Sequence, residues 1–82
     1  IKLTAYPNPS SRNLTIDYAV KGSPNSLELD VFDVLGKKVV SQKLNSNQGR
    51  VNLDVESLNA GVYFYAIKVD GSVVKTERLI IK

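Results

Sequence analysis

The sequence contains no cysteine, no histidine and no tryptophan, and each absence excludes a kind of structure or chemistry. Without cysteine, no disulfide can hold the chain together. Cysteine and histidine are also the commonest zinc ligands and the usual nucleophile and general base, so ordinary zinc sites and Cys/His catalytic arrangements are excluded. The absence of tryptophan counts against a planar sugar-binding platform. Stability must therefore come from strand pairing and from the burial of apolar side chains.

Long apolar runs and clustered charge are missing as well. No apolar run approaches the roughly 20 residues that a membrane-spanning helix needs, and the chain shows no signal peptide. The net charge is only +3, and the basic residues are scattered, with no run longer than Lys37-Lys38. A solvated surface is therefore expected rather than a nucleic-acid-binding stripe. Because the chain of 82 residues begins with Ile1 rather than Met, we expect one domain that is a piece of a longer protein.

The sequence does contain period-2 alternation of apolar and polar residues, which is the pattern of half-buried β-strands. Seven such stretches follow one another at the spacing typical of a β-sandwich. They cover residues 1–5, 14–20, 27–34, 39–44, 51–55, 62–69 and 72–82. We predict an all-β fold, an Ig-like antiparallel β-sandwich of about seven strands, with an open barrel as the alternative. "Ig-like" refers to architecture only, because the Cys…Trp…Cys pattern is absent.

Turn signals separate these stretches. The segment "YPNPSS" holds two prolines that fix their own φ and remove two backbone donors, so it should end the first strand. The dipeptide Asp70-Gly71 is a strong hairpin signal, and "ESLNAG" reads as a tight turn in which Gly61 adopts a positive φ or allows close backbone approach. At Val31-Phe32 the alternation breaks, which indicates either two partly covered faces or a β-bulge.

No combination of residues indicates catalysis. The G-x-S-x-G and G-x-x-x-x-G-K-[ST] motifs do not occur. Glu28 and Asp30 share a face, but their alternation with leucine and valine predicts a solvent-facing pair. A calcium site built from Asp30, Asp33, Asp54 and Glu56 is disfavoured, because no D-x-D-x-D-G loop is present. We therefore predict no catalytic residue, no cofactor and no metal.

The aromatic run Tyr63-Phe64-Tyr65 must point to alternating faces, so at least one ring should be buried. A sugar platform is therefore disfavoured. From the residues alone, function stays open between a binding module and a structural or targeting module.

Four segments recur in a particular order: "YPNPSSRNLTIDY", "VFDVLGKKV", "LNAGVYFYAIKVDG" and the lysine-ended "VVKTERLIIK". In this order, over nearly the whole chain, they resemble the type A C-terminal sorting domain of cargo proteins of the type IX (Por) secretion system of Gram-negative bacteria. The matched residues fall into an opening motif, a central turn, a third motif and a basic tail. These are Pro7, Asn8 and Pro9; Asp33, Leu35, Gly36, Lys37 and Val39; Leu58, Ala60, Gly61, Val62 and Tyr63; and Lys75, Arg78 and Lys82.

The resemblance implies a non-enzymatic signal that directs an N-terminal cargo from the periplasm through the outer-membrane translocon to the cell surface or the medium. The implied partners are the translocon, outer-membrane shuttle components and a sortase-like peptidase that cuts upstream of residue 1. Attachment of the cargo to a surface lipopolysaccharide often follows.

Recognition is expected at the tail, and the other motif residues are expected to be mainly structural. The tail residues are Lys75, Arg78, Leu79, Ile80, Ile81 and Lys82. A last strand at a sheet edge would offer free backbone groups to a partner strand or to the same edge of a second copy, while its charges discourage indiscriminate pairing. On this hypothesis, removal of residues 79–82 leaves a mostly folded domain that is not secreted. The alternatives are a fibronectin-like or carbohydrate-binding accessory module and a purely structural spacer.

Overall fold

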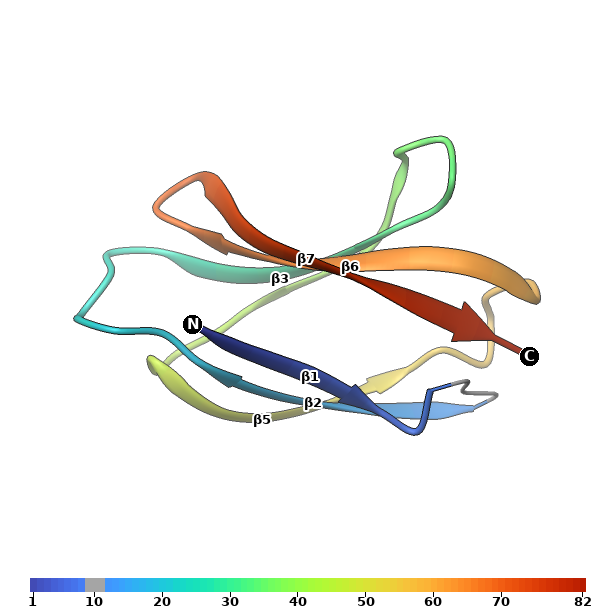
Figure 1. Cartoon of the computed structure of the whole chain (residues 1–82), viewed down its shortest axis with the longest axis horizontal. Helices are drawn as coiled ribbons and strands as arrows, with labels where there is room; N and C mark the ends of the chain where they lie inside the picture. The colour runs from blue at the N-terminus through green and yellow to red at the C-terminus, as the bar shows by residue number, and fades with distance from the viewer. Residues whose placement is uncertain (9–11) are drawn as a thin grey trace.

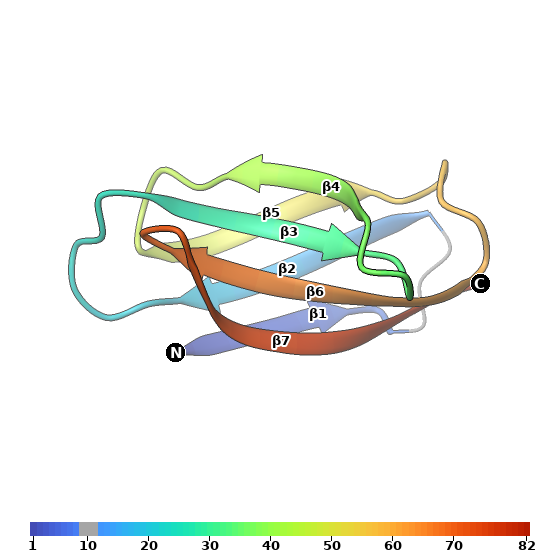
Figure 2. The same ribbon diagram turned by 90° about the horizontal axis from the view of Figure 1, so that it is seen from above.

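The computed structural model describes residues 1–8 and 12–82, and these form seven β-strands arranged in two sheets. The three-stranded sheet has the order β1-β2-β5 and the four-stranded sheet has the order β4-β3-β6-β7, with every neighbouring pair antiparallel. The sheets lie face to face (Figures 1 and 2), which confirms the predicted sandwich. The strands are β1 Lys2–Tyr6, β2 Asn13–Ala19, β3 Leu27–Phe32, β4 Lys38–Lys43, β5 Gln48–Asp54, β6 Gly61–Val69 and β7 Ser72–Ile81.

One apolar core fills the space between the sheets, and it is built from the alternating residues of the predicted strands. On β2, Leu14 and Ile16 are fully buried while their neighbours are partly exposed. Leu29, Ile67 and Leu79 contribute equally buried side chains from the opposite sheet. Within the described ranges there is no helix long and apolar enough to cross a membrane.

Strand limits differ from the sequence-based prediction at β5, which begins at Gln48 rather than at residue 51. The polar residues Gln48 and Arg50 pair with Ala19 and Asp17 of β2, so cross-strand hydrogen bonding extends the strand beyond its apolar pattern. At β3 both anticipated explanations of the broken alternation hold. The register with β4 shifts between Val31 and Phe32, and Phe32 lies on the outer face, where it is half-buried.

The predicted hairpin turn at Asp70-Gly71 is confirmed. Asp70 has φ +50° and Gly71 has φ +88°, so both central residues lie in the left-handed region that two-residue hairpins require. The turn joins β6 to β7 and sets Val69 opposite Ser72, which starts the longest strand pairing in the molecule.

Strand directions bring several connections to one end of the sandwich. β1, β3 and β7 finish there and β6 begins there, at the right of Figure 1. We call this the C-terminal end, and it contains residues 6–8, 33–37, 61–63 and 78–82.

Candidate recognition surface

Among the described strands, β7 lies at a sheet edge and pairs only with β6, and its predicted recognition residues divide between the core and the surface. Leu79 and Ile81 point inward and are buried, whereas Arg78 and Lys82 are exposed. Ile80 is half-buried on the outer face. Lys75 lies nearer the start of the strand, and its Nζ is 3.9 Å from Oε1 of Glu77 on the same strand.

This division leads to a different prediction for removal of residues 79–82 than the sequence alone does. Removal of residues 79–82 takes away two buried core side chains and the last part of β7, which pairs with residues 61–63 of β6. Loss of one large buried aliphatic side chain typically costs about 2–5 kcal/mol. A domain of this size has little stability to spare, so the truncated chain should unfold rather than remain mostly folded.

Asn8 of the opening motif reaches across to the free edge of β7. Its Nδ2 donates a hydrogen bond to the carbonyl oxygen of Arg78 at 3.2 Å, and its Oδ1 accepts one from the backbone N–H of Ile80 at 3.1 Å. The side-chain amide therefore takes the place that a peptide group of a neighbouring strand would occupy. Pro7 precedes it after a cis peptide bond with Tyr6. Pro9, the third residue of the motif, lies outside the described residues.

The central motif is a tightly bonded turn between β3 and β4. Oδ1 of Asp33 accepts hydrogen bonds from the backbone N–H groups of Leu35 at 3.0 Å and Lys37 at 2.9 Å. The backbone N–H of Asp33 also donates to the carbonyl oxygen of Lys37 at 2.9 Å. Gly36 has φ +85°, where residues with a side chain are strained. The turn thus has a fixed shape, and Leu35 at its tip is 90% exposed.

The third motif lines up against the tail. Gly61, Val62 and Tyr63 pair with Ile81, Ile80 and Leu79 respectively. Gly61 has φ +153° with no atom near its missing Cβ, which bears out the positive-φ alternative and not the close approach. The Tyr63 hydroxyl donates to the carbonyl oxygen of Asn59 at 2.7 Å and so ties the preceding turn to β6.

All four motifs therefore meet at the C-terminal end, although up to 72 positions separate the residues in contact. Asn8 bonds to β7, the third motif pairs with β7, and the Asp33 turn follows Phe32, which pairs with Phe64 of β6. The result is one continuous surface that combines exposed cations, a protruding turn and a partly covered sheet edge.

Glu28 and Asp30 are not the simple solvent-facing pair that their alternation predicts. Asp30 is 0% exposed on the outer face of the four-stranded sheet. Its Oδ2 lies 3.6 Å from Nζ of Lys38 and 3.7 Å from Nζ of Lys68, and Oε2 of Glu28 lies 3.4 and 3.7 Å from the same two atoms. Two lysines from the flanking strands thus neutralise the two carboxylates and cover the inner one, because long lysine stems can lie along a sheet surface.

Among the described residues, no three carboxylate, histidine or cysteine side chains gather as metal ligands would. Two of the acids once considered for calcium serve local turns instead. Asp33 holds the central turn, and Oδ1 of Asp54 accepts from the backbone N–H of Glu56 at 3.0 Å.

The outer face of the three-stranded sheet carries a polar network. Nε of Arg50 donates to Oδ1 of Asp17 at 2.8 Å, and the Tyr6 hydroxyl donates to Oδ2 at 3.0 Å. The bond from Arg50, with a smaller contribution from Tyr6, holds the pKa of Asp17 below its usual value. Partial burial and the bond to Asp17 raise the pKa of Tyr6. These bonds tie β1, β2 and β5 together across the sheet.

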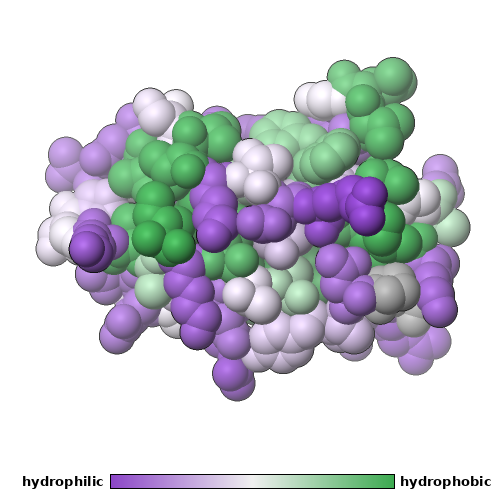
Figure 3. Space-filling model, viewed as in Figure 1, coloured by the Kyte–Doolittle hydropathy of each residue, from purple (hydrophilic) through white to green (hydrophobic). Residues whose placement is uncertain are grey.

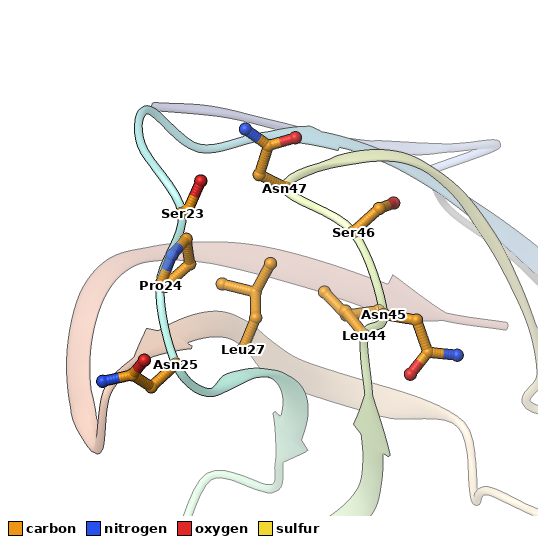
Figure 4. A pocket seen from close by; sticks show the side chains of 8 residues that line it. All are labelled: Ser23, Pro24, Asn25, Leu27, Leu44, Asn45, Ser46 and Asn47. Atoms are coloured by element: carbon orange, nitrogen blue, oxygen red, sulfur yellow. The ribbon is translucent and has the colours of Figure 1, made fainter.

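A depression at the opposite end of the sandwich lies between the β2–β3 and β4–β5 loops (Figure 4). Leu27 and Leu44 face one another at its floor, and the amides of Asn25 and Asn45 point away from it. Nδ2 of Asn47 donates to the carbonyl oxygen of Gly22 at 2.8 Å, which joins the two loops. The lining contains no charged and no aromatic side chain, so the depression has neither an aromatic surface for stacking on a sugar nor a cationic group to pair with an anion.

The aromatic run also lacks a platform. Tyr63 and Tyr65 are buried and only Phe64 lies on the outer face, half-buried, which confirms that at least one ring belongs to the core. Sequence reasoning missed the contact of Asn8 with β7 and the burial of Asp30. No local signal reveals either one, because each depends on strands that are distant in sequence.

The fold and surface define a small antiparallel β-sandwich whose unusual features gather around its last strand. Comparison with known families identifies the family of this sandwich. The family model of the secretion system C-terminal sorting domain matches residues 4–82. The chain belongs to this family. No curated protein matches the chain.

Membership supports a role as a C-terminal sorting signal of the type IX secretion system. It implies interaction with that machinery and a secreted protein that is routed to the cell surface or the extracellular space. The family is not known to be catalytic.

Proposed function

We propose that this domain carries an N-terminal cargo through the outer-membrane translocon, and that the machinery reads the C-terminal end of the sandwich. The observation that supports this most is the meeting of all four family motifs at that end, around the last strand. Shuttle components of the outer membrane are the first partners. A sortase-like peptidase then cuts upstream of residue 1, and the released cargo is attached to a surface lipopolysaccharide or shed.

Within this surface, we assign recognition to the exposed part of the tail. Arg78 and Lys82 offer positive charge, whereas Leu79 and Ile81 act by holding β7 in place. A partner strand added at the edge of β7 has residues 75–77 to pair with, directly before Arg78 and clear of the β6–β7 hairpin, because Asn8 already bonds the outward groups of Arg78 and Ile80. To pair with β7 beyond residue 77, the partner strand must displace the Asn8 side chain. Pairing of two copies through the same edge is subject to the same restriction.

The test fuses residues 1–82 to a periplasmic reporter in a host with this secretion system. The wild-type fusion should appear at the cell surface. The double variant Arg78→Glu/Lys82→Glu should remain folded, since both side chains are exposed, but should be displayed about tenfold less or worse, because a close like-charge contact with the partner costs several kcal/mol.

The matched control is Lys21→Glu/Lys43→Glu, which makes the same charge change with exposed lysines near the opposite end. It should be displayed like the wild type. Normal display of the tail variant would refute recognition at the tail, and absence of display of the wild-type fusion would refute the sorting role itself.

A further inference from the structure

Apolar side chains gather on the outer face of the four-stranded sheet at the C-terminal end. The β3–β4 turn arches over this face (Figures 1 and 2), and Val34 and Leu35 at its tip are 65% and 90% exposed. Figure 3 shows the corresponding hydrophobic surface at the upper right, above further hydrophobic atoms. We define the turn patch as Phe32, Val34, Leu35, Val62, Phe64 and Ile80.

Strand pairing makes this patch continuous. Phe32 lies opposite Phe64 across β3 and β6, and Val62 lies opposite Ile80 across β6 and β7. Val62 and Phe64 are two positions apart on β6, so they share a face. Single exposed apolar residues are ordinary, but a contiguous group on one face of a small monomeric domain marks an interaction site.

The turn also fixes the position of the most exposed member. The two bonds from Asp33 Oδ1 and the backbone bond between Asp33 and Lys37 hold the loop in one shape. Leu35 therefore projects without being free to fold back onto the sheet. A preorganised anchor loses little conformational entropy when it docks.

The fully exposed charged side chains beside the patch are positive. Lys37, Arg78 and Lys82 are exposed beside it. The carboxylate of Asp33 is engaged in the turn, and Glu28 and Asp30 lie farther along the sheet between two lysines. A partner that fits must combine an apolar pocket with acidic groups around it.

We propose that the turn patch docks into an apolar pocket bordered by carboxylates on a protein component of the type IX machinery, with Leu35 as the central anchor. This inference rests on the proposed function and adds to it an apolar contact that lies beside the charged tail. The lysine and arginine side chains around the patch set orientation, and the leucine supplies most of the affinity.

The experiment compares Leu35→Asp with Val73→Asp in the reporter fusion. Val73 is 51% exposed next to the β6–β7 hairpin, at the opposite end, and so provides a matched control. Both variants should keep the wild-type melting temperature within about 4 °C, as expected for exposed substitutions. Surface display should fall about tenfold or more for Leu35→Asp, as for loss of an interface anchor, and should stay within about twofold of the wild type for Val73→Asp.

Display of Leu35→Asp at the wild-type level, with the wild type displayed, would overturn this inference alone. An equal loss of display in Val73→Asp would also overturn it, because the loss would then not be specific to the turn patch. Lack of display of the wild-type fusion removes the proposed function and this inference with it.

Two solution measurements test whether a second copy of the chain or a membrane occupies the turn patch instead. Sedimentation of residues 1–82 should give a monomer for both the wild type and Leu35→Asp. A wild-type dimer that Leu35→Asp dissociates would assign the patch to a second copy and overturn the proposal. Leu35-dependent binding to phosphatidylglycerol–phosphatidylethanolamine vesicles would assign it to a membrane instead, with the same consequence.

Discussion

At the scale of single residues, two aspartates on outer sheet faces illustrate how neighbours decide the state of a side chain. Asp17 is bonded to the guanidinium of Arg50 and to Tyr6. Asp30 is fully buried beside two lysine ammonium groups, and its two carboxylate oxygens accept no hydrogen bond from the described residues. The alternating sequence pattern places both on outer faces but does not distinguish their environments.

The depressed pKa of Asp17 gives a pH-dependent prediction. Folding favours its ionised form, so its contribution to stability is complete above the unfolded value of 3.8 and is lost as pH falls through the lower folded value. Thermal melting of the wild type and Asp17→Asn between about pH 5 and pH 2 should show a stability difference that shrinks with acidification.

The control is the Arg50→Gln background, which lacks the main cause of the pKa shift. In that background the pH-dependent part of the Asp17→Asn effect should largely disappear. A difference that stays constant with pH in the wild-type background would contradict the assignment.

At the scale of elements, local alternation of apolar and polar residues sets where the strands lie, whereas pairing with neighbouring strands sets where they end. β5 extends through polar residues because β2 pairs with them, and β3 ends in a turn whose Asp33 replaces the missing ladder bonds. The motif "FDVLGKK" therefore has a structural role, which is to hold the β3–β4 turn, in addition to any role in recognition.

Asp33 gives the prediction at this scale. Asp33→Ala removes acceptors for two backbone N–H groups and should lower the free energy of unfolding by about 1–2 kcal/mol in urea titrations. Asp33→Asn keeps one side-chain carbonyl oxygen and should lose clearly less. Equal losses for the two variants would show that the carboxylate charge, rather than these hydrogen bonds, holds the turn.

At the scale of the whole molecule, Asn8 joins the two sheets on the side where β1 and β7 approach each other. It extends the connection after β1 in one sheet to the free edge of β7 in the other. The opening motif therefore ends the first strand, as its prolines predict, and also covers part of the exposed edge at the tail. Covered edges resist unwanted strand pairing.

Asn8→Ala should lower the free energy of unfolding by about 0.5–1.5 kcal/mol, the usual net value of a lost hydrogen-bonding group. It should also accelerate amide hydrogen exchange at Ile80, whose N–H loses its acceptor. Asn25→Ala, an exposed asparagine in the loop before β3, is the control and should change neither measurement. Unchanged exchange at Ile80 in Asn8→Ala would refute the edge contact.

The sequence by itself determined the all-β class, the approximate strands, the hairpin at Asp70-Gly71 and the family, because alternation, turn residues and ordered motifs are local properties of the chain. It also predicted the residues of the candidate surface, although not their division into core and surface. The tertiary structure alone decided which strands lie at edges, that Leu79 and Ile81 are core while Arg78 and Lys82 are exposed, and that Asn8 bonds to β7. The physical reason is that sheet order and cross-sheet contacts depend on how distant strands pack together, and no local pattern specifies that packing.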